Sequence, residues 1–95
     1  MRITEFEADS IKKCFHKIFG DGEIYLFGSR TDDSQKGGDI DLYVKPKVKL
    51  DLYNKKIRFL TELKQLIEDQ KIDVVLAVDA KRIIEKEAKI TGQLL

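Results

Sequence analysis

Two aspartates, Asp39 and Asp41, stand two positions apart in the run DIDLYV, in which apolar residues alternate with others. In a β-strand, such side chains point to the same face, with Cα atoms about 6.5–7 Å apart. Two carboxylates at that spacing repel each other, and a bound divalent cation removes the repulsion. Oxygen ligands suit Mg²⁺, and such ions can hold the attacking and leaving oxygens of a phosphoryl transfer. Taken alone, the pair also fits a solvated strand face that carries Asp-x-Asp by chance.

Gly28 and Ser29 directly follow the apolar run EIYLF. Glycine allows a close approach of the backbone to a polyphosphate, and backbone N–H groups with the Ser29 hydroxyl can donate to the anion. An ordinary strand-ending turn explains the same two residues equally well. Arg30 fits a phosphate contact or a surface salt bridge, and both interpretations stay open. The chain has no GxxxxGK[ST] and no GxGxxG motif.

A third acid, Asp73, lies near the start of the apolar run IDVVLA. If this run forms a strand beside residues 39–45, its carboxylate can reach the same site as the other two. There it can bind a metal and accept the proton of an attacking hydroxyl. The alternative is an acid at a strand end that faces water.

Hydrophobic periodicity predicts the elements that position these residues. We expect a small α/β (α+β) domain with the order αββαβα. Its elements are a helix over Glu5–Phe19, strands over Glu23–Phe27 and Asp39–Lys45, a helix over Leu50–Asp69, a strand over Ile72–Val78 and a helix from Asp79 to about Ile90.

Several residues indicate how the helices begin and end. Thr4 and Glu7 have the spacing of a capping box, and Asp79 is the predicted N-cap of the last helix. Gly20 and Gly92 follow the last apolar residues of the first and last helices, where glycine commonly ends a helix.

Apolar side chains at helical spacing predict which helix faces enter the core. In the first helix these are Ile11, Cys14, Phe15, Ile18 and Phe19, with His16 at the surface. In the second they are Tyr53, Ile57, Leu60, Leu63, Leu66 and Ile67, and in the last Ile83, Ile84 and Ala88. In the strand over 39–45, we expect Ile40, Leu42 and Val44 to face the core and Tyr43 to share the other face with the aspartates.

Composition narrows the class of protein. The 95 residues are 42% hydrophobic and 37% charged, which is typical of a globular chain. The net charge of +1 lacks the concentrated positive field of a dedicated nucleic-acid binder. The single cysteine, Cys14, excludes an internal disulfide, and we expect an inert core thiol. No secretory or membrane-spanning stretch is visible, so we expect a cytoplasmic protein without a membrane partner.

The run FGSRTDDSQKGGDIDLYV resembles the signature of the DNA polymerase β-like nucleotidyltransferase superfamily, which is Gly-Ser, about ten residues and then Asp-x-Asp. The similarity is greatest to minimal, antitoxin-type members, the MNT proteins. It covers nearly the whole chain, including the helix before the motif and the later strand with a single Asp. The resemblance implies that residues 1–95 form one minimal nucleotidyltransferase domain, with helices packed on a small mixed sheet.

The resemblance also implies roles for the candidate residues. Asp39 and Asp41 would bind the catalytic Mg²⁺, Asp73 would complete the triad as a further metal ligand, and Gly28 with Ser29 would hold the triphosphate of a nucleotide, usually ATP. Many minimal members are encoded with a HEPN-type ribonuclease toxin, and some silence it by adenylylating a toxin tyrosine. One departure is that many continue after Gly-Ser-Arg with a small residue, a basic residue and glycine, whereas this chain has Thr31, Asp32 and Asp33.

Three hypotheses follow for the function. The first is an Mg²⁺-dependent enzyme that transfers AMP from ATP to a hydroxyl of a partner protein, as the antitoxin of a HEPN/MNT-type pair. The second is a non-catalytic antitoxin that occludes a HEPN-type toxin. The third is a nucleotidyltransferase for RNA or a small molecule, which the near-neutral charge and the lack of a substrate-binding domain disfavour. Self-association of so small a domain stays open.

Overall fold

The computed structural model describes residues 3–28, 40–67 and 71–95. The elements follow the predicted order αββαβα, with one short strand added after the last helix. They are α1 (Glu5–Phe19), β1 (Gly22–Phe27), β2 (Ile40–Pro46), α2 (Leu52–Leu66), β3 (Ile72–Leu76), α3 (Ile83–Thr91) and β4 (Gln93–Leu94). None of the helices in these ranges is long and apolar enough to cross a membrane.

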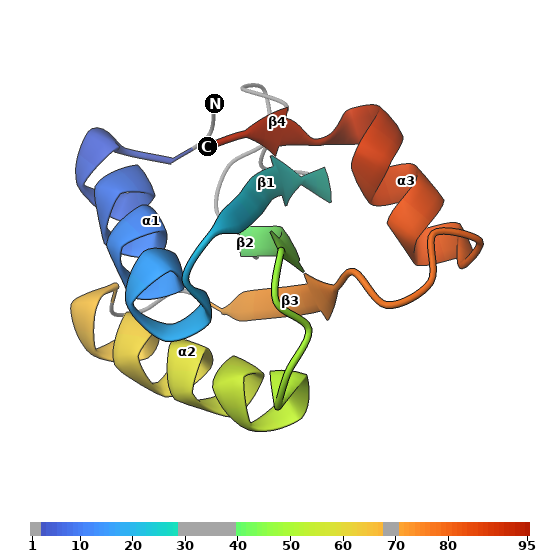
Figure 1. The fold of residues 1–95 in the computed structure, drawn as a ribbon. Coiled ribbons are helices and arrows are strands. Elements are labelled where there is room, and N and C mark those ends of the chain that lie inside the picture. Colours follow the sequence, from blue (N-terminus) through green and yellow to red (C-terminus); the bar gives the residue numbers. More distant parts are fainter. Residues whose placement is uncertain (1–2, 29–39, 68–70) are drawn as a thin grey trace.

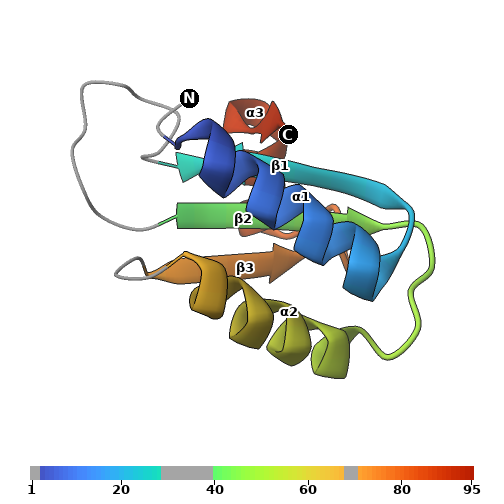
Figure 2. The same cartoon turned by 90° about the vertical axis from the view of Figure 1, so that its left-hand side faces the viewer.

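The four strands form one mixed sheet in the order β3-β2-β1-β4. β1 runs antiparallel to β2 and to β4, whereas β2 and β3 are parallel. α1 and α2 cover one face of the sheet, and α3 lies on the other (Figure 1). A view across the strands shows that β1 ends, and β2 and β3 begin, at the same end of the sheet (Figure 2). The expected mixed sheet with packed helices is therefore confirmed.

The predicted capping residues of α1 are confirmed. The Thr4 hydroxyl accepts from the Glu7 backbone N–H at 3.0 Å, and the Glu7 carboxylate accepts from the Thr4 N–H at 2.8 Å. Gly20 ends the helix at a φ of 81°, which favours glycine. Between these ends, the predicted apolar stripe of α1 is buried.

The main core lies between the sheet and the helices α1 and α2. β2 contributes Ile40, Leu42 and Val44, each with no exposed surface, as the alternation of its sequence predicts. They pack with Phe15 of α1 and Phe59 of α2 in one cluster of buried residues. Because these residues face α1 and α2, the residues between them on β2 point to the opposite face of the sheet.

The predicted inner face of α2 is partly wrong. Tyr53 is 71% exposed, and Ile57 and Leu66 are also exposed, whereas Phe59 and Leu63 are fully buried. The Phe59 ring packs edge to face against Phe19 of α1, with ring centroids 5.8 Å apart. Packing of α2 against α1 therefore turns Phe59 into the core. The periodicity of the α2 sequence alone did not predict this.

The predicted start and inner face of α3 are also wrong. The N-cap position is Arg82 rather than Asp79, whose carboxylate accepts from the Lys81 N–H in a turn before the helix. Ile83 is 84% exposed and Ile84 is 40% exposed. The residues that α3 buries against the sheet are Glu85 and Ala88. The inward position predicted for Ala88 is confirmed. Glu85, rather than Ile83 or Ile84, is the other buried residue of the helix.

Gly92 follows α3 as expected and has a packing role. A Cβ at this position would collide with the Ala88 carbonyl oxygen and lie 3.2 Å from the Tyr25 Cβ. Glycine therefore lets the chain turn closely past the end of α3 and enter β4. The two-residue β4 pairs with Tyr25 and Leu26 of β1, which extends the sheet by a strand that the sequence did not predict.

Candidate functional site

Asp41 and Asp73 lie side by side on neighbouring strands. The register of the parallel pair places Asp41 of β2 opposite Asp73 of β3. Adjacent strands are about 4.8 Å apart, and residues in register point to the same face. Because Ile40 and Leu42 face the main core, both carboxylates lie on the opposite face, which is the face of α3. The register therefore meets the geometric expectation for these two acids.

Gly28 lies directly against the Asp41 side chain. It follows the end of β1, where Phe27 is the cross-strand partner of Asp41. Its φ is 77°, and a Cβ built on it would lie 2.5 Å from the Asp41 Oδ2 atom. The positive φ favours glycine, and an added Cβ would also force the Asp41 carboxylate to shift. The turn after β1 and the carboxylate of β2 thus form one compact unit.

The exposure of the two carboxylates differs. Asp41 is half-buried, whereas Asp73, on the edge strand of the sheet, is exposed. Oxygen donors that are this close and open to solvent have the chemistry that Mg²⁺ prefers. Among residues 3–28, 40–67 and 71–95, no three acidic, histidine or cysteine side chains are grouped closely enough to hold a metal. The carboxylates of Asp41 and Asp73 could therefore provide part of the ligands of a Mg²⁺ ion.

Three predicted site residues, Ser29, Arg30 and Asp39, lie outside the described residues. The structure thus brings together Gly28, Asp41 and Asp73, and the other positions stay predictions.

The face that carries the aspartates continues into a buried polar network. The Tyr43 hydroxyl, two positions after Asp41, donates to Glu85 Oε1 of α3 at 2.9 Å. Glu85 Oε2 accepts from the Arg82 Nε at 2.8 Å and from the N–H groups of Val78 and Asp79 at 3.1 and 2.8 Å. The Glu85 side chain is only 1% exposed. This carboxylate therefore fastens α3 and the segment before it to β2.

The hydrogen bonds shift the pKa values within this network. Burial alone would raise the pKa of Glu85, but donors from Asp79, Tyr43, Arg82 and Val78 outweigh it, so the pKa lies below its usual value. Burial, followed by the hydrogen bond to Glu85, raises the pKa of Tyr43 to about 12. At neutral pH the network therefore consists of a carboxylate and a protonated phenol.

Sequence reasoning did not identify this network. Glu85 follows the apolar pair Ile83 and Ile84 and lies three positions before Ala88, but as an acid it was not counted among the residues expected to face inward. Tyr43 was expected on the face of the aspartates, and that placement is correct. The only available signal was an aromatic hydroxyl on the strand face opposite the main core, because a buried Tyr usually finds a hydrogen-bond partner.

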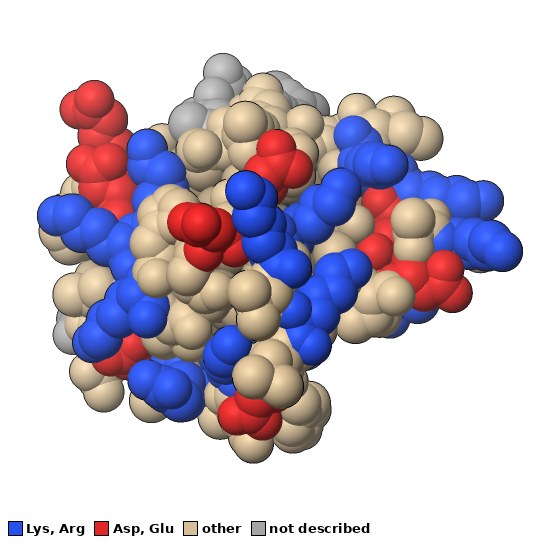
Figure 3. Space-filling model, in the orientation of Figure 1, with Lys and Arg blue, Asp and Glu red and all other residues tan. Residues whose placement is uncertain are grey.

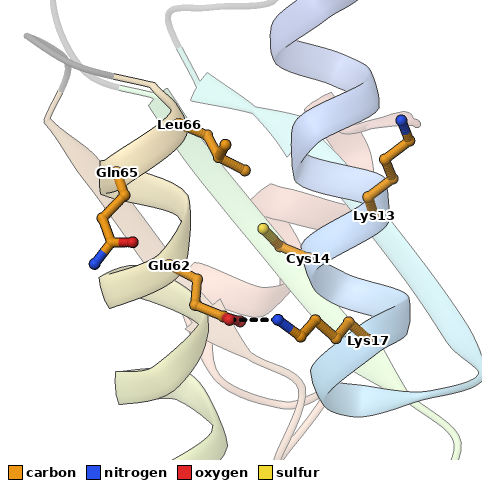
Figure 4. A pocket seen from close by; sticks show the side chains of 6 residues that line it. All are labelled: Lys13, Cys14, Lys17, Glu62, Gln65 and Leu66. Carbon is orange, nitrogen blue, oxygen red and sulfur yellow. Dashed lines mark hydrogen bonds and ion pairs between the residues drawn. The ribbon is translucent and has the colours of Figure 1, made fainter.

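The helices α1 and α2 enclose a pocket on the other side of the sheet. It has a volume of about 290 Å³ and is lined by Lys13, Cys14 and Lys17 of α1 and by Glu62, Gln65 and Leu66 of α2. Cys14, Lys17, Glu62 and Leu66 point into the space between the two helices, whereas Lys13 and Gln65 point away from it (Figure 4). Lys17 Nζ pairs with Glu62 Oε1 at 2.6 Å. Burial raises the pKa of the Cys14 thiol, and the Glu62 charge raises it further. A protonated, buried thiol fits the predicted inert core cysteine rather than a nucleophile.

The surface charges are mixed in sign. On the face of the molecule that Figure 3 shows, basic side chains are spread widely, with acidic ones between them. This pattern agrees with the net charge of +1. On this face, therefore, charges of both signs are interspersed rather than gathered into a field of one sign.

Comparison with known proteins adds independent findings. The model of the family "Polymerase beta, Nucleotidyltransferase" matches residues 9–95. No curated protein sequence matches the chain. The fold is similar to a chain in the complex of a tri-AMPylated HEPN toxin with an MNT antitoxin from Shewanella oneidensis, with a TM-score of 0.73, 22% identity and coverage of 97% of this chain and 71% of that one. It is also similar to a chain in a mutant MntA–HpeT toxin–antitoxin complex, with a TM-score of 0.71, 19% identity and coverage of 90% and 69%.

Proposed function

Since the chain belongs to the polymerase beta nucleotidyltransferase family, we propose that it transfers AMP from ATP to a hydroxyl of a partner protein, as the antitoxin of a HEPN/MNT-type pair. The observation that carries the proposal is the pairing of Asp41 with Asp73, in register, beside the Gly28 turn. The matching family has nucleotidyl transfer as its activity, and this geometry supplies the carboxylates for it. Protein as the acceptor is the finer part of the proposal.

The proposed reaction is an attack of the acceptor hydroxyl on the α-phosphate of ATP. The acceptor hydroxyl oxygen attacks the α-phosphorus of ATP and forms a new P–O bond, while the bond to the β-phosphate oxygen breaks. Pyrophosphate leaves with that electron pair, and the Asp73 carboxylate accepts the acceptor's proton. The exposed position of Asp73 suits this role, because the acceptor must reach it from outside.

The other residues bind and orient. Asp39, Asp41 and Asp73 would hold Mg²⁺, whose charge stabilises the phosphate oxygens as they become more negative. Gly28 leaves the backbone open to the triphosphate, and we propose that Ser29 and Arg30 donate to it. Because Gly28 contacts Asp41, the nucleotide and its metal would be held from one rigid corner of the sheet.

The partner is proposed from the two structural neighbours. Both belong to toxin–antitoxin complexes, and in one of them the HEPN toxin is tri-AMPylated. A HEPN-type toxin is therefore our candidate acceptor for this chain.

The test is transfer of label from α-labelled ATP, with Mg²⁺, to a HEPN-type protein encoded beside this chain. We expect Asp41→Asn and Asp73→Asn each to lower the initial rate at least 100-fold, because each removes a charge needed only at the reacting phosphate. Asp9→Asn, which changes an exposed aspartate of α1, is the matched control and should keep the wild-type rate. Undiminished transfer by Asp41→Asn would contradict the proposed chemistry.

The second candidate is neutralisation by occlusion without catalysis. The observation that favours it is the run Thr31, Asp32 and Asp33, which puts two acids after the proposed triphosphate-binding residues. Under this hypothesis, the double variant Asp39→Asn with Asp41→Asn still protects cells from the toxin. If the folded variant binds the toxin but fails to protect, occlusion alone is excluded.

A further inference from the structure

The two most exposed large apolar side chains in the described part of the chain lie on the same helix. They are Ile83, at 84%, and Ile90, at 83%, and both belong to α3. Seven positions separate them, so they lie two turns apart on one side of the helix, about 10.5 Å along its axis. Single surface isoleucines need no explanation, but an aligned pair at helical spacing is typical of a helix that packs against a second surface.

The aligned isoleucines point away from the body of the molecule. α3 buries Glu85 and Ala88 against the sheet. At about 100° per residue, the line through Ile83 and Ile90 lies roughly opposite these two buried residues. In Figure 1, α3 lies at one side of the molecule, with the sheet on its inner side and no described helix or strand beyond its outer side. This outer face is therefore open to a partner.

Two opposite charges flank the isoleucines. Lys86 and Glu87 are exposed, and helical spacing places one on each side of the line from Ile83 to Ile90. Within the described residues, neither of these charged side chains has an ion-pair partner. Because the two charges are of opposite sign, the face complements another surface with one charge of each sign. We call these four residues, Ile83, Lys86, Glu87 and Ile90, the α3 stripe.

We propose that the α3 stripe is the contact between two copies of this chain, whose α3 helices pack side by side and parallel about a twofold axis. The proposal goes beyond the proposed function and does not depend on it. In this arrangement Ile83 meets Ile83 of the second copy, and Ile90 meets Ile90. The rotation also exchanges the two flanks, so Lys86 of each copy lies opposite Glu87 of the other, and two ion pairs form.

Charge selects the direction of the pairing and the occupant. In an antiparallel pair of α3 helices about a twofold axis, Lys86 would face Lys86 and Glu87 would face Glu87, so like charges would repel. In the parallel pair, every charged member of the stripe faces its opposite. The stripe is thus complementary to itself, which is the property that a twofold contact between identical chains requires.

The contact is small, so the dimer should be weak. A standard interface buries about 800 Å² on each partner, which is more than one stripe of the nine-residue α3 supplies. Exposed ion pairs add little affinity, and their main effect is on orientation. We therefore expect a dimer that forms only at high micromolar concentrations of the chain.

A second copy would also hold α3 in place. The helix begins at Arg82 without a side-chain hydrogen bond at its N-cap, and it buries only two residues. One of them, Glu85, bonds to Tyr43 of β2. Because association of folded chains stabilises the folded state by mass action, the melting temperature should rise with chain concentration.

Sedimentation velocity of the full chain over a concentration series measures the dimer. We expect Ile83→Asp to raise the dissociation constant at least tenfold, because it places two carboxylates face to face in an apolar contact. Leu50→Asp changes a residue before α2 that is 68% exposed, and this matched control should stay within twofold of wild type. Circular dichroism should show the same folded content for both variants.

Charge reversal tests the parallel arrangement. Lys86→Glu and Glu87→Lys should each raise the dissociation constant at least threefold, since each turns both ion pairs into repulsions. The double variant carries both changes and restores the pairs in swapped order, so its dissociation constant should return to within twofold of wild type. Single reversals that leave the dimer unchanged would overturn the parallel pairing.

Two further outcomes would overturn the dimer itself. One is a wild-type chain that stays monomeric up to about 1 mM. The other is a dimer that Ile83→Asp leaves as strong as Leu50→Asp does, because the contact would then lie elsewhere. If the monomeric chain binds a HEPN-type protein and Ile83→Asp abolishes that binding, the α3 stripe belongs to that partner instead.

Discussion

On the α1 and α2 side of the sheet, β2 presents Ile40, Leu42 and Val44, all completely buried in the main core. On the α3 side, the same strand presents Asp41, which is half-buried, and Tyr43, which is 2% exposed and bonded to Glu85. The first face is sealed by two long helices along its length. Within the described residues, the second face is covered by the nine-residue α3, which is bonded to Tyr43 through Glu85.

This difference shows how a small domain combines stability with a polar site. The free energy of folding comes mainly from the apolar face, where each buried side chain removes surface from water. The other face carries carboxylates that would be costly in a closed core. Substitutions on the two faces should therefore separate loss of stability from loss of activity.

The largest expected effect is on the apolar face. Phe59→Ala removes a fully buried ring that packs against Phe19, and should lower the free energy of unfolding by about 3–5 kcal/mol. Urea denaturation followed by circular dichroism measures this loss. Tyr53→Ala, on the same helix but 71% exposed, is the control and should change stability by less than about 1 kcal/mol. Equal losses for the two variants would show that burial of Phe59 in the main core is not what stabilises this side of the sheet.

The next effect concerns the corner where the two strands meet. Gly28→Ala forces a Cβ into a backbone with a φ of 77° and against the Asp41 carboxylate. We expect transfer of AMP to fall at least tenfold, with a loss of roughly 1–2 kcal/mol in stability. Gly20→Ala is the comparison, because its φ of 81° is similar but no atom lies within 4 Å of the added Cβ. If both variants lose stability but only Gly28→Ala loses activity, the contact with Asp41 is the cause.

The next test concerns the network under α3. Tyr43→Phe removes the donor to Glu85 Oε1 and should cost about 1–3 kcal/mol of stability at pH 7.

The folded pKa of Glu85 lies below its usual 4.5, so the stabilisation is fully present above that pH and is lost as the pH falls through the folded pKa. The stability difference between wild type and Glu85→Gln should therefore shrink below about pH 4.5. A difference that is constant from pH 7 to pH 3 would show that the carboxylate charge does not contribute.

The smallest effect concerns Cys14, on the apolar side. Burial and the Glu62 charge keep its thiol protonated, so we expect alkylation at pH 7.5 to be at least tenfold slower than that of the unfolded chain in urea. Cys14→Ser should leave AMP transfer within twofold of wild type. Rapid alkylation that stops AMP transfer would instead connect the α1–α2 pocket to the site on the opposite face.

Local patterns in the sequence were sufficient for much of the fold. The capping box of Thr4 and Glu7 and the apolar stripe of α1 involve residues within a few positions of one another, and both are confirmed. The alternation in β2 correctly separated Leu42 from Asp41. Such features depend on the period of a single element, so the sequence expresses them directly.

Features set by contacts between distant segments were not predictable. The inner face of α2 depends on Phe19 of α1, and the burial of Glu85 depends on Tyr43, 42 positions earlier. The sequence identified Asp41, Asp73 and Gly28 by residue type and spacing. Only the tertiary structure placed Asp41 opposite Asp73, because the register depends on how the buried faces of both strands pack together, and not on either strand alone.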